Sequence, residues 1–457
     1  MLRFAVPRVL PAYRRRPLLR HPAQVIVTGF AVAVLIGTFV LMLPIARTGP
    51  GGAPFVTALF TATSAVCVTG LTTVDTPTYW TDFAQVVILG LIQVGGLGIM
   101  VMASLLVLLV SRRMGLRSRL TVAAETKSLG IGDVRTVLLG VLKFTVIFEA
   151  VCAVALAGRF FLGYDEPLGR AIYLGVFHSI SAFNNAGFAL YSDNLIGFAT
   201  DPWICVPIMV VVILGGLGFP VVLELRRHLR RPRQWSLHTK LTVSMTAVLL
   251  LTGCLFITAN EWGNPRTLGA LDTPGKLLVG IFHGVIPRTA GFNSLDVGQM
   301  EEGTWLGTIV LMFIGGGSAG TAGGIKVTTF VVLFFAIYAE VRGEAAVNAF
   351  DRKLDPRVLR QALTVALLSV AAVVLSTLLL VKITAFGMAD LLFETTSAFA
   401  TVGLSTGITA DLPGSAQIVL VLLMFGGRLG PITLVSALAL RDRQLLYQLP
   451  EGRPIIG

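Results

Sequence analysis

Four short segments share one pattern, in which an aromatic residue and a run of small or polar residues lead to a glycine followed by Leu or Phe. They read FTATSAVCVTGL (60–71), FHSISAFNNAGF (177–188), FHGVIPRTAGF (282–292) and FETTSAFATVGL (393–404). Their glycines recur at intervals of 104 to 117 residues: Gly70, Gly187, Gly291 and Gly403. The chain therefore contains one unit in four copies.

The backbone of these segments could hold a cation. A half-helix that ends inside a membrane directs the negative end of its dipole toward that point. Glycine lets the main chain face an ion without a side chain in the way, and rings of carbonyl oxygens can replace the water shell of potassium. The candidate lining residues are Val68, Thr69, Gly70, Asn185, Ala186, Gly187, Thr289, Ala290, Gly291, Thr401, Val402 and Gly403. Because they carry no carboxylate, which calcium and magnesium sites usually recruit, a monovalent cation is expected.

The composition places these segments in a membrane. Hydrophobic residues make up 54% of the chain and charged residues 13%, and the mean hydropathy is +0.82, so a soluble surface could not be covered. Apolar runs of about 20 residues cross a bilayer. Eight runs qualify, near 24–44, 83–110, 137–162, 203–225, 241–259, 305–339, 359–381 and 416–440.

Each motif lies between two spans, and its apolar part is too short to cross. Such a segment is expected to enter the membrane and turn back, with its non-helical end buried or facing water. The predicted fold is an all-α integral membrane protein with four helix, re-entrant pore loop, helix units around one central pore. The predicted pore units are 24–110, 136–225, 241–340 and 359–440, and the cytoplasmic segments are 1–23, 111–135, 226–240, 341–358 and 441–457.

The positive-inside rule predicts the orientation. Of the 36 Lys and Arg residues, 26 lie on the face that both termini share, so that face is expected to be cytoplasmic. The opposite face is rich in acids, which concentrate cations. The net charge of +12 is then explained by the orientation of the chain in the membrane. The basic N-terminal segment could also contact anionic lipid. No nucleic-acid partner is expected.

The second span of the third unit is expected to break. It carries the run Gly315, Gly316, Gly317, Ser318, Ala319, Gly320, Thr321, Ala322, Gly323 and Gly324. Glycine-rich runs form helices poorly, so a loop at membrane depth is predicted. Shorter clusters at 95–98 and 215–218 are better explained by close helix packing.

Basic residues at membrane depth are costly and call for a function. We expect Arg428 to repel a passing cation and to donate hydrogen bonds to carbonyls of the 315–324 loop. Lys326 could act in the same way or extend to the cytoplasmic edge. Arg288 directly precedes a filter segment, and we expect it to pair with Glu394 and brace the filter from behind.

The remaining reactive side chains show no catalytic or metal pattern. The four cysteines stand singly and are interpreted as small buried apolar residues. His178 and His283 each follow the phenylalanine of a motif, and packing or local hydrogen bonding is favoured over metal ligation. The sequence has no phosphate-binding fingerprint, so any nucleotide control is expected from another chain. A membrane enzyme is the least favoured class.

SAFNNAGFAL, PRTAGFNS, TSAFATVGLSTGIT and GGGSAGTAGGIKVT resemble segments of the Trk/Ktr/HKT superfamily of potassium transporters. With one span before its first re-entrant segment, the chain most resembles the membrane (B) subunits of bacterial Ktr systems. The resemblance implies a potassium pathway in each chain of a homodimer in the bacterial inner membrane. It also implies a cytoplasmic ring of nucleotide-binding (RCK-type) subunits.

The same resemblance assigns roles to residues. It implies a selectivity filter at the twelve lining residues and an intramembrane gate at residues 315–324, in which Lys326 and Arg428 take part. Cys67 departs from the family pattern, which has a residue with a hydroxyl group at this position. All four filter glycines are present, which by the logic of the family favours potassium over sodium.

Other readings stay open from the sequence alone. A sodium-coupled potassium symporter with alternating access fits broken helices and internal repeats, although four like loops fit a fourfold pore better. An ammonium or unselective cation pore, and a duplication whose glycines only pack, are further alternatives. The sequence also leaves open whether sodium activates transport and which nucleotide acts on the partner.

Overall fold

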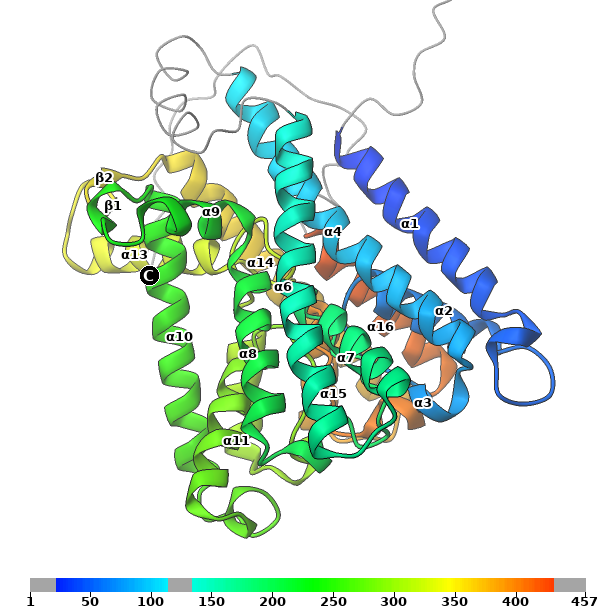
Figure 1. Cartoon of the computed structure of the whole chain (residues 1–457). Helices are drawn as coiled ribbons and strands as arrows, with labels where there is room; N and C mark the ends of the chain where they lie inside the picture. The colour runs from blue at the N-terminus through cyan, green and yellow to red at the C-terminus, as the bar shows by residue number, and fades with distance from the viewer. Residues whose placement is uncertain (1–21, 114–133, 431–457) are drawn as a thin grey trace, which may run out of the picture.

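The computed structural model describes residues 22–113 and 134–430, and the regular structure of this part of the chain is almost all helix (Figure 1). The first unit contains α1 (Pro22–Leu41), α2 (Phe55–Val66), α3 (Thr76–Tyr79) and α4 (Asp82–Arg113). The second contains α6 (Val134–Gly163), α7 (Leu168–Phe183), α8 (Pro202–Leu217) and α9 (Phe219–His228).

The third unit contains α10 (Leu237–Glu261), α11 (Thr273–Val285), α12 (Glu302–Phe313) and α13 (Val327–Val341). A small antiparallel hairpin of β1 (Asn348–Ala349) and β2 (Arg352–Lys353) leads to the fourth unit. That unit contains α14 (Pro356–Ile383), α15 (Met388–Ala400) and α16 (Gly414–Leu429). Short 3-10 turns connect these elements at Pro44–Ala46, Ile196–Phe198, Pro232–Gln234, Leu268–Ala270, Val297–Gln299 and Ile408–Asp411.

The long helices have the length and surface of membrane spans. In the described residues, five helices are long and apolar enough to cross, namely α1, α4, α6, α10 and α14, and the bent pair of α8 and α9 makes a sixth. Large apolar side chains on them face outward, such as Phe39, Val154 and Leu375, as a lipid surface requires. With α12 plus α13 and α16 as the remaining two, the arrangement is consistent with the eight predicted spans.

The four re-entrant helices α2, α7, α11 and α15 are short, with 12 to 16 residues each. Proline precedes the first two, at Pro54 and Pro167. Asp272 caps α11 by accepting a hydrogen bond from the amide of Gly275, as N-cap residues do. Each helix packs against the first span of its own unit and ends at a filter segment.

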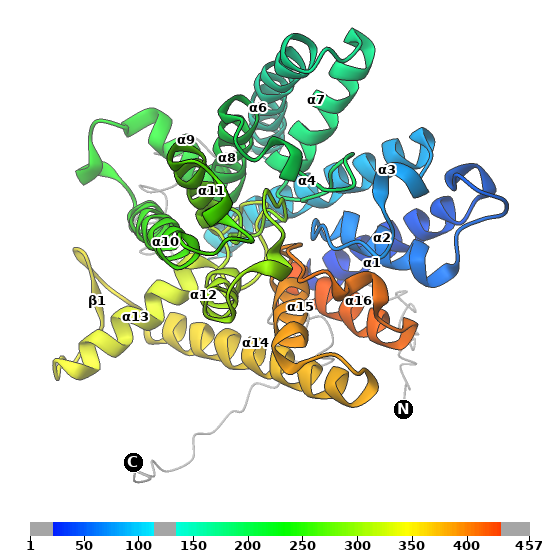
Figure 2. The same ribbon diagram turned by 90° about the horizontal axis from the view of Figure 1, so that it is seen from below.

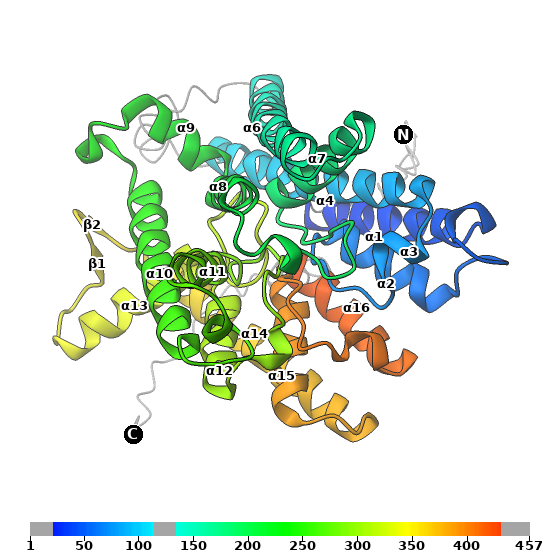
Figure 3. The same ribbon diagram turned by 60° about the horizontal axis from the view of Figure 1, so that its bottom comes forward.

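The units form a closed ring around the loops that follow the re-entrant helices (Figures 2 and 3). The first unit contacts the second through α4 with α6 and α7, and the second contacts the third through α8 with α11. The third contacts the fourth through α12 with α15, and α16 closes the ring against α2. The first and third units are therefore opposite each other, as are the second and fourth.

The glycine clusters of the second spans fit against the re-entrant helices. A side chain on Gly95, Gly215 or Gly427 would meet the carbonyl oxygen of Val66, Phe183 or Phe399 at 1.6 to 2.1 Å. Each of these carbonyls belongs to the re-entrant helix of the same unit, four residues before the filter glycine. Close backbone packing, as predicted for the clusters at 95–98 and 215–218, thus holds the re-entrant helices of the first, second and fourth units in place.

Within the described residues, two second spans are broken, and only one break was expected. The chain leaves the helix between α12 and α13, as the glycine run predicted. The span predicted at 203–225 also bends by 101° between α8 and α9. Gly218 adopts a φ of +90° there, and Pro220 follows, which cannot continue the α8 hydrogen-bond ladder. The cluster at 215–218 therefore forms an elbow in addition to a packing surface.

Part of the predicted cytoplasmic face can be placed. The predicted segments 1–23, 111–135 and 441–457 lie wholly or largely outside the described residues, as does the end of the last predicted span. The linker 341–358 carries the hairpin. There, a carboxylate oxygen of Asp351 forms an ion pair with Nζ of Lys240 at 3.3 Å. This pair joins it to the linker 226–240.

Candidate selectivity filter and gate

The four filter segments share an unusual backbone conformation. Two residues before each filter glycine, Val68, Asn185, Thr289 and Thr401 adopt positive φ angles of 50° to 71°. The filter glycines themselves have φ angles of +70° to +93°. Positive φ is rare for residues other than glycine. Such a strained conformation is kept only where the packing and hydrogen bonds around it stabilise it. Residues with positive φ thus alternate with a residue of negative φ along each segment. This alternation turns successive carbonyl groups toward the same side of the strand.

The filter segments meet in a ring of backbone atoms. A side-chain carbon on Gly70 would lie 2.3 Å from the carbonyl oxygen of Ala186, and one on Gly403 would lie 2.1 Å from that of Thr69. Gly187 and Gly291 face the carbonyls of Ala290 and Val402 in the same way, at 2.9 and 2.6 Å. The residue before each glycine therefore presents its carbonyl at the ring, and no side chain larger than hydrogen fits between neighbouring strands.

Hydrogen bonds from the filter amides tie the strands to the re-entrant helices. The amides of Thr69, Ala186 and Val402 donate to the carbonyls of Ser64, Ser181 and Ser397 at 2.7 to 2.9 Å. In the third unit, whose motif is one residue shorter, Ala290 donates to Ile286 at 3.1 Å. The filter residues before the glycines are buried. All twelve predicted filter residues thus belong to one ring.

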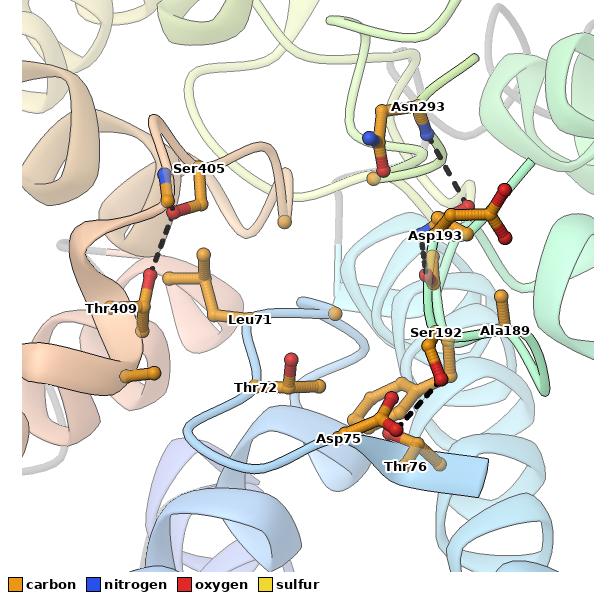
Figure 4. Close-up of a pocket in the computed structure, with 18 of the residues that line it drawn as sticks. Leu71, Thr72, Asp75, Thr76, Ala189, Ser192, Asp193, Asn293, Ser405 and Thr409 are labelled. Atoms are coloured by element: carbon orange, nitrogen blue, oxygen red, sulfur yellow. Dashed lines mark hydrogen bonds between the residues drawn. The ribbon is translucent and has the colours of Figure 1, made fainter. Parts of the chain in front are cut away.

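An open cavity of about 680 Å³ lies outside the ring, lined by all four filter glycines (Figure 4). Asp75, Asp193 and Asp296 line its wall, and Ser192 donates a 2.8 Å hydrogen bond to Asp75. Burial raises the pKa of Tyr191, which also lines the cavity, to about 12. The phenol therefore stays neutral at physiological pH, and the negative charge of this vestibule comes from carboxylates that attract cations.

The loop between α12 and α13 packs beneath the candidate filter. On one side, Thr321 donates from its amide to Gly215 at 3.0 Å and from its hydroxyl to Phe183 at 3.3 Å, both in the second unit. On the other side, Gly323 packs so closely on Thr401 of the fourth unit that an added carbon would lie 2.0 Å from its hydroxyl. Phe183 and Thr401 end or follow the re-entrant helices of the second and fourth units, so the loop packs on both neighbours of the third unit at the inner ends of those helices.

Arg428 joins this loop to the first unit. It is buried, donates from Nη1 to the carbonyl of Thr321, and donates from Nη2 to the carbonyl of Gly95 at 3.3 Å. The hydrogen bond to the loop is the contact expected from the sequence. Lys326 donates to the carbonyl of Ala322 within the loop itself, and in the described residues no hydrogen bond joins its side chain to another unit. The two basic residues are therefore placed differently.

The predicted pairing of Arg288 with Glu394 is wrong. Arg288 donates to the carbonyls of Thr246 at 3.2 Å and Gly315 at 3.1 Å. Glu394 accepts hydrogen bonds from the fourth-unit segment that follows the filter, including the amide of Thr406 at 3.0 Å. The two side chains belong to different units, and each is satisfied locally, because a buried charge needs hydrogen-bond partners and backbone groups supply them here.

This correction predicts the outcome of a charge swap. The double variant Arg288→Glu with Glu394→Arg is expected to be no more active in ion uptake than either single variant, since neither side chain contacts the other. Each single variant leaves buried carbonyl or amide groups unpaired and should be destabilised by about 1.5–3 kcal/mol per lost bond to a charged group. Thermal unfolding in detergent and uptake by reconstituted protein measure both effects. Restored uptake in the double variant would contradict the contacts described above.

A polar cluster next to the second filter strand was missed from the sequence. Glu149, in the middle of α6, accepts 3.1 Å hydrogen bonds from the amides of Gln93 and Asn184, and Asn184 also donates to Gln93 at 2.7 Å. Asn184 directly precedes the filter residue Asn185. An acid inside an apolar span is a functional signal and could have identified this cluster.

These observations define a helical membrane protein with four re-entrant pore loops around one axis. A family model described as a cation transport protein, TrkH, matches residues 5–444. The crystal structure of the potassium transporter TrkH from Vibrio parahaemolyticus has the same fold, with a TM-score of 0.72 at 19% identity over 93% of this chain and 87% of that one.

Curated relatives match over nearly their whole length. The Ktr system potassium uptake protein B of Bacillus subtilis is 41% identical over 95% of this chain and 97% of the relative. The protein of the same name from Vibrio alginolyticus is 36% identical over 95% and 94%. The potassium/sodium uptake protein NtpJ of Enterococcus hirae is 35% identical over 95% and 97%. The chain belongs to the TrkH family of cation transport proteins, so it is a membrane transporter and not an enzyme.

Proposed function

We propose that this chain takes up potassium through a selective pore. The observation that carries the proposal is the closed ring of backbone carbonyls, one strand from each unit, which no side chain interrupts. Neutral carbonyl rings suit a dehydrated monovalent cation, and no carboxylate is present in the filter segments to favour a divalent one. The names of the relatives, which are potassium uptake proteins, support the same ion.

Sodium is the ion against which this proposal must be tested. One relative is named for both potassium and sodium uptake, and ammonium resembles potassium in size. In the proposed pore, sodium competes weakly with potassium, because rigidly placed carbonyls fit the larger ion. Sodium is also proposed to activate the pore from a site away from the filter, so that it raises the rate of uptake without being required for it.

The loop at residues 315–324 is proposed to be the gate of this pore. Its hydrogen bond to Arg428 supports this role, because Arg428 also donates to Gly95 of the first unit, which lies opposite the third, and a segment tied to the far side of the ring blocks the path. Arg428 adds a fixed positive charge beneath the filter, which repels a passing cation. Lys326 adds a second charge on the loop.

The proposed assembly is a homodimer with a cytoplasmic ring of nucleotide-binding subunits. Two of the relatives are named as protein B of a Ktr system, which supports a further component. We place both termini and the basic segments on the cytoplasmic side of a bacterial inner membrane, where that component could contact the linkers 226–240 and 341–358. The sequence lacks the phosphate-binding fingerprints that would let this chain bind the nucleotide itself.

Rubidium uptake into proteoliposomes of the purified chain tests the proposal. Potassium is expected to inhibit the uptake at concentrations at which sodium does not, and uptake is expected to proceed without a co-ion. Equal inhibition by sodium and potassium would contradict the selective filter. Flux that requires sodium on the same side would favour the symporter instead, although a ring of four like loops fits a pore better than the inverted repeats of such carriers.

A further inference from the structure

One position of the repeated motif makes the same contact in three of the four units. The residue directly after the phenylalanine of each re-entrant helix is Thr61, His178, His283 or Glu394. His178, His283 and Glu394 are buried, with 0 to 1% of their surface exposed. All three lie behind the filter, and the ion pathway proposed above does not use their side chains. Their shared position suggests a shared task.

Each of these three side chains holds the amide three residues after the filter glycine. Nε2 of His178 accepts from the amide of Leu190 at 3.3 Å, and Nε2 of His283 accepts from the amide of Ser294 at 3.3 Å. Oε1 of Glu394 accepts from the amide of Thr406 at 3.0 Å. Chemically different residues thus make one bond at equivalent points of the ring.

The surroundings of His178 and Glu394 fix these acceptors in place. Nδ1 of His178 lies 2.8 Å from the carbonyl of Leu174, and since a carbonyl can only accept, the proton resides on Nδ1 and Nε2 is free to accept. Glu394 also accepts from the hydroxyls of Ser405 at 2.5 Å and Thr409 at 2.8 Å. The anchoring bonds are therefore preorganised, as a positioning group requires.

The first unit has no equivalent bond. Its side chain at this position, Thr61, is too short to reach the amide of Thr73, and the buried Thr61 hydroxyl has no hydrogen-bond partner among the described residues. In the first unit, the Ser64 hydroxyl accepts a 3.0 Å hydrogen bond from the amide of Gly70 itself, as Ser397 does from Gly403 at 3.1 Å in the fourth unit. The chain therefore supplies its own comparison, because the first filter strand lacks the bond beyond the glycine that the other three have.

We propose that His178, His283 and Glu394 are positioning residues for ion selectivity. A bond to the amide just beyond the glycine prevents the strand from moving outward, and this fixes the separation of the carbonyls that face the ion. Without the bond, the ring can relax around a smaller ion such as sodium. The inference rests on the proposed potassium filter and adds the residues that set its dimensions.

Rubidium uptake by His283 variants tests this role. In His283→Leu, which keeps the volume but cannot accept a hydrogen bond, the potassium-over-sodium preference in competition is expected to fall about fivefold, the effect of one lost hydrogen bond. His283→Gln places an oxygen near the position of Nε2 and should restore the preference to within twofold of the parent. Thr61→Val, the matched control in the first unit, should leave it unchanged.

A second variant keeps the test decisive if His283→Leu does not fold. His283→Asn is polar but stops short of the amide, so it should show the same loss of preference. An unchanged preference in the Leu and Asn variants, or a loss in Thr61→Val as large as theirs, would overturn the positioning role. Failure of the parent protein to discriminate at all would overturn the proposed filter instead, so the two failures can be distinguished.

Discussion

Replacing Gly291 by serine is expected to reduce the potassium-over-sodium preference of uptake by about tenfold or more. The φ angle at this position is +71°, and a side-chain carbon would lie 2.6 Å from the carbonyl oxygen of Val402. Forcing a left-handed conformation on serine costs about 1–2 kcal/mol, and the contact must also push the carbonyl away from the ring. A change of about 1.4 kcal/mol corresponds to a factor of ten. A cost of this size at the ring is therefore expected to change the potassium-over-sodium preference by about tenfold.

Gly407 offers a matched control for this change. It also has a positive φ angle, of +103°, but an added carbon would meet nothing within 4 Å. Gly407→Ser therefore carries the backbone strain without touching the ring, and we expect its ion preference to equal that of the parent. The ring assignment fails if Gly291→Ser discriminates as well as the parent, or if both variants lose the preference equally.

Replacing Arg428 by alanine is expected to increase the rate of rubidium uptake by about tenfold or more. The side chain ties Thr321 of the gate loop to Gly95 of the first unit, and its charge lies beneath the filter. Hydrogen bonds to charged groups contribute about 1.5–3 kcal/mol each, so their loss shifts the loop away from its closed position. The positive barrier to a cation is removed in the same step.

Lys326→Met is the comparison for Arg428→Ala. It also removes one positive charge, but among the described residues Lys326 donates to Ala322 within the loop and to no other unit, so the loop stays tied to the other units. We expect a smaller increase in uptake than for Arg428→Ala, with the ion preference unchanged in both. Stopped or unchanged uptake in folded Arg428→Ala protein would refute the gate.

The repeated motif explains why so much of the architecture could be predicted. A filter glycine needs a special backbone angle, and this requirement ties the local sequence to one geometry; the run at 315–324 excludes helix for a similar local reason. The glycines at Gly95 and Gly215 were correctly interpreted as packing positions. In each case, the residue type itself restricts the backbone.

The errors concern partners that are distant in the chain. Arg288 and Glu394 were paired because opposite charges attract, yet backbone carbonyls and amides satisfy each one, and backbone groups leave no mark in the sequence. The bend at Gly218 was missed because GGLG is compatible with a straight helix in α4 and with an elbow after α8. The contacts of His178 and His283 depend on an amide 11 or 12 residues later, which only the folded loop brings near.

The most direct test of the carbonyl ring is a crystal structure of the protein grown in rubidium, with the anomalous signal used to locate the ion. The ring predicts a rubidium peak on the axis, within coordination distance of the carbonyl oxygens of Thr69, Ala186, Ala290 and Val402, which sodium does not displace. Rubidium bound only in the acidic vestibule, with no peak between these four carbonyls, would contradict the account.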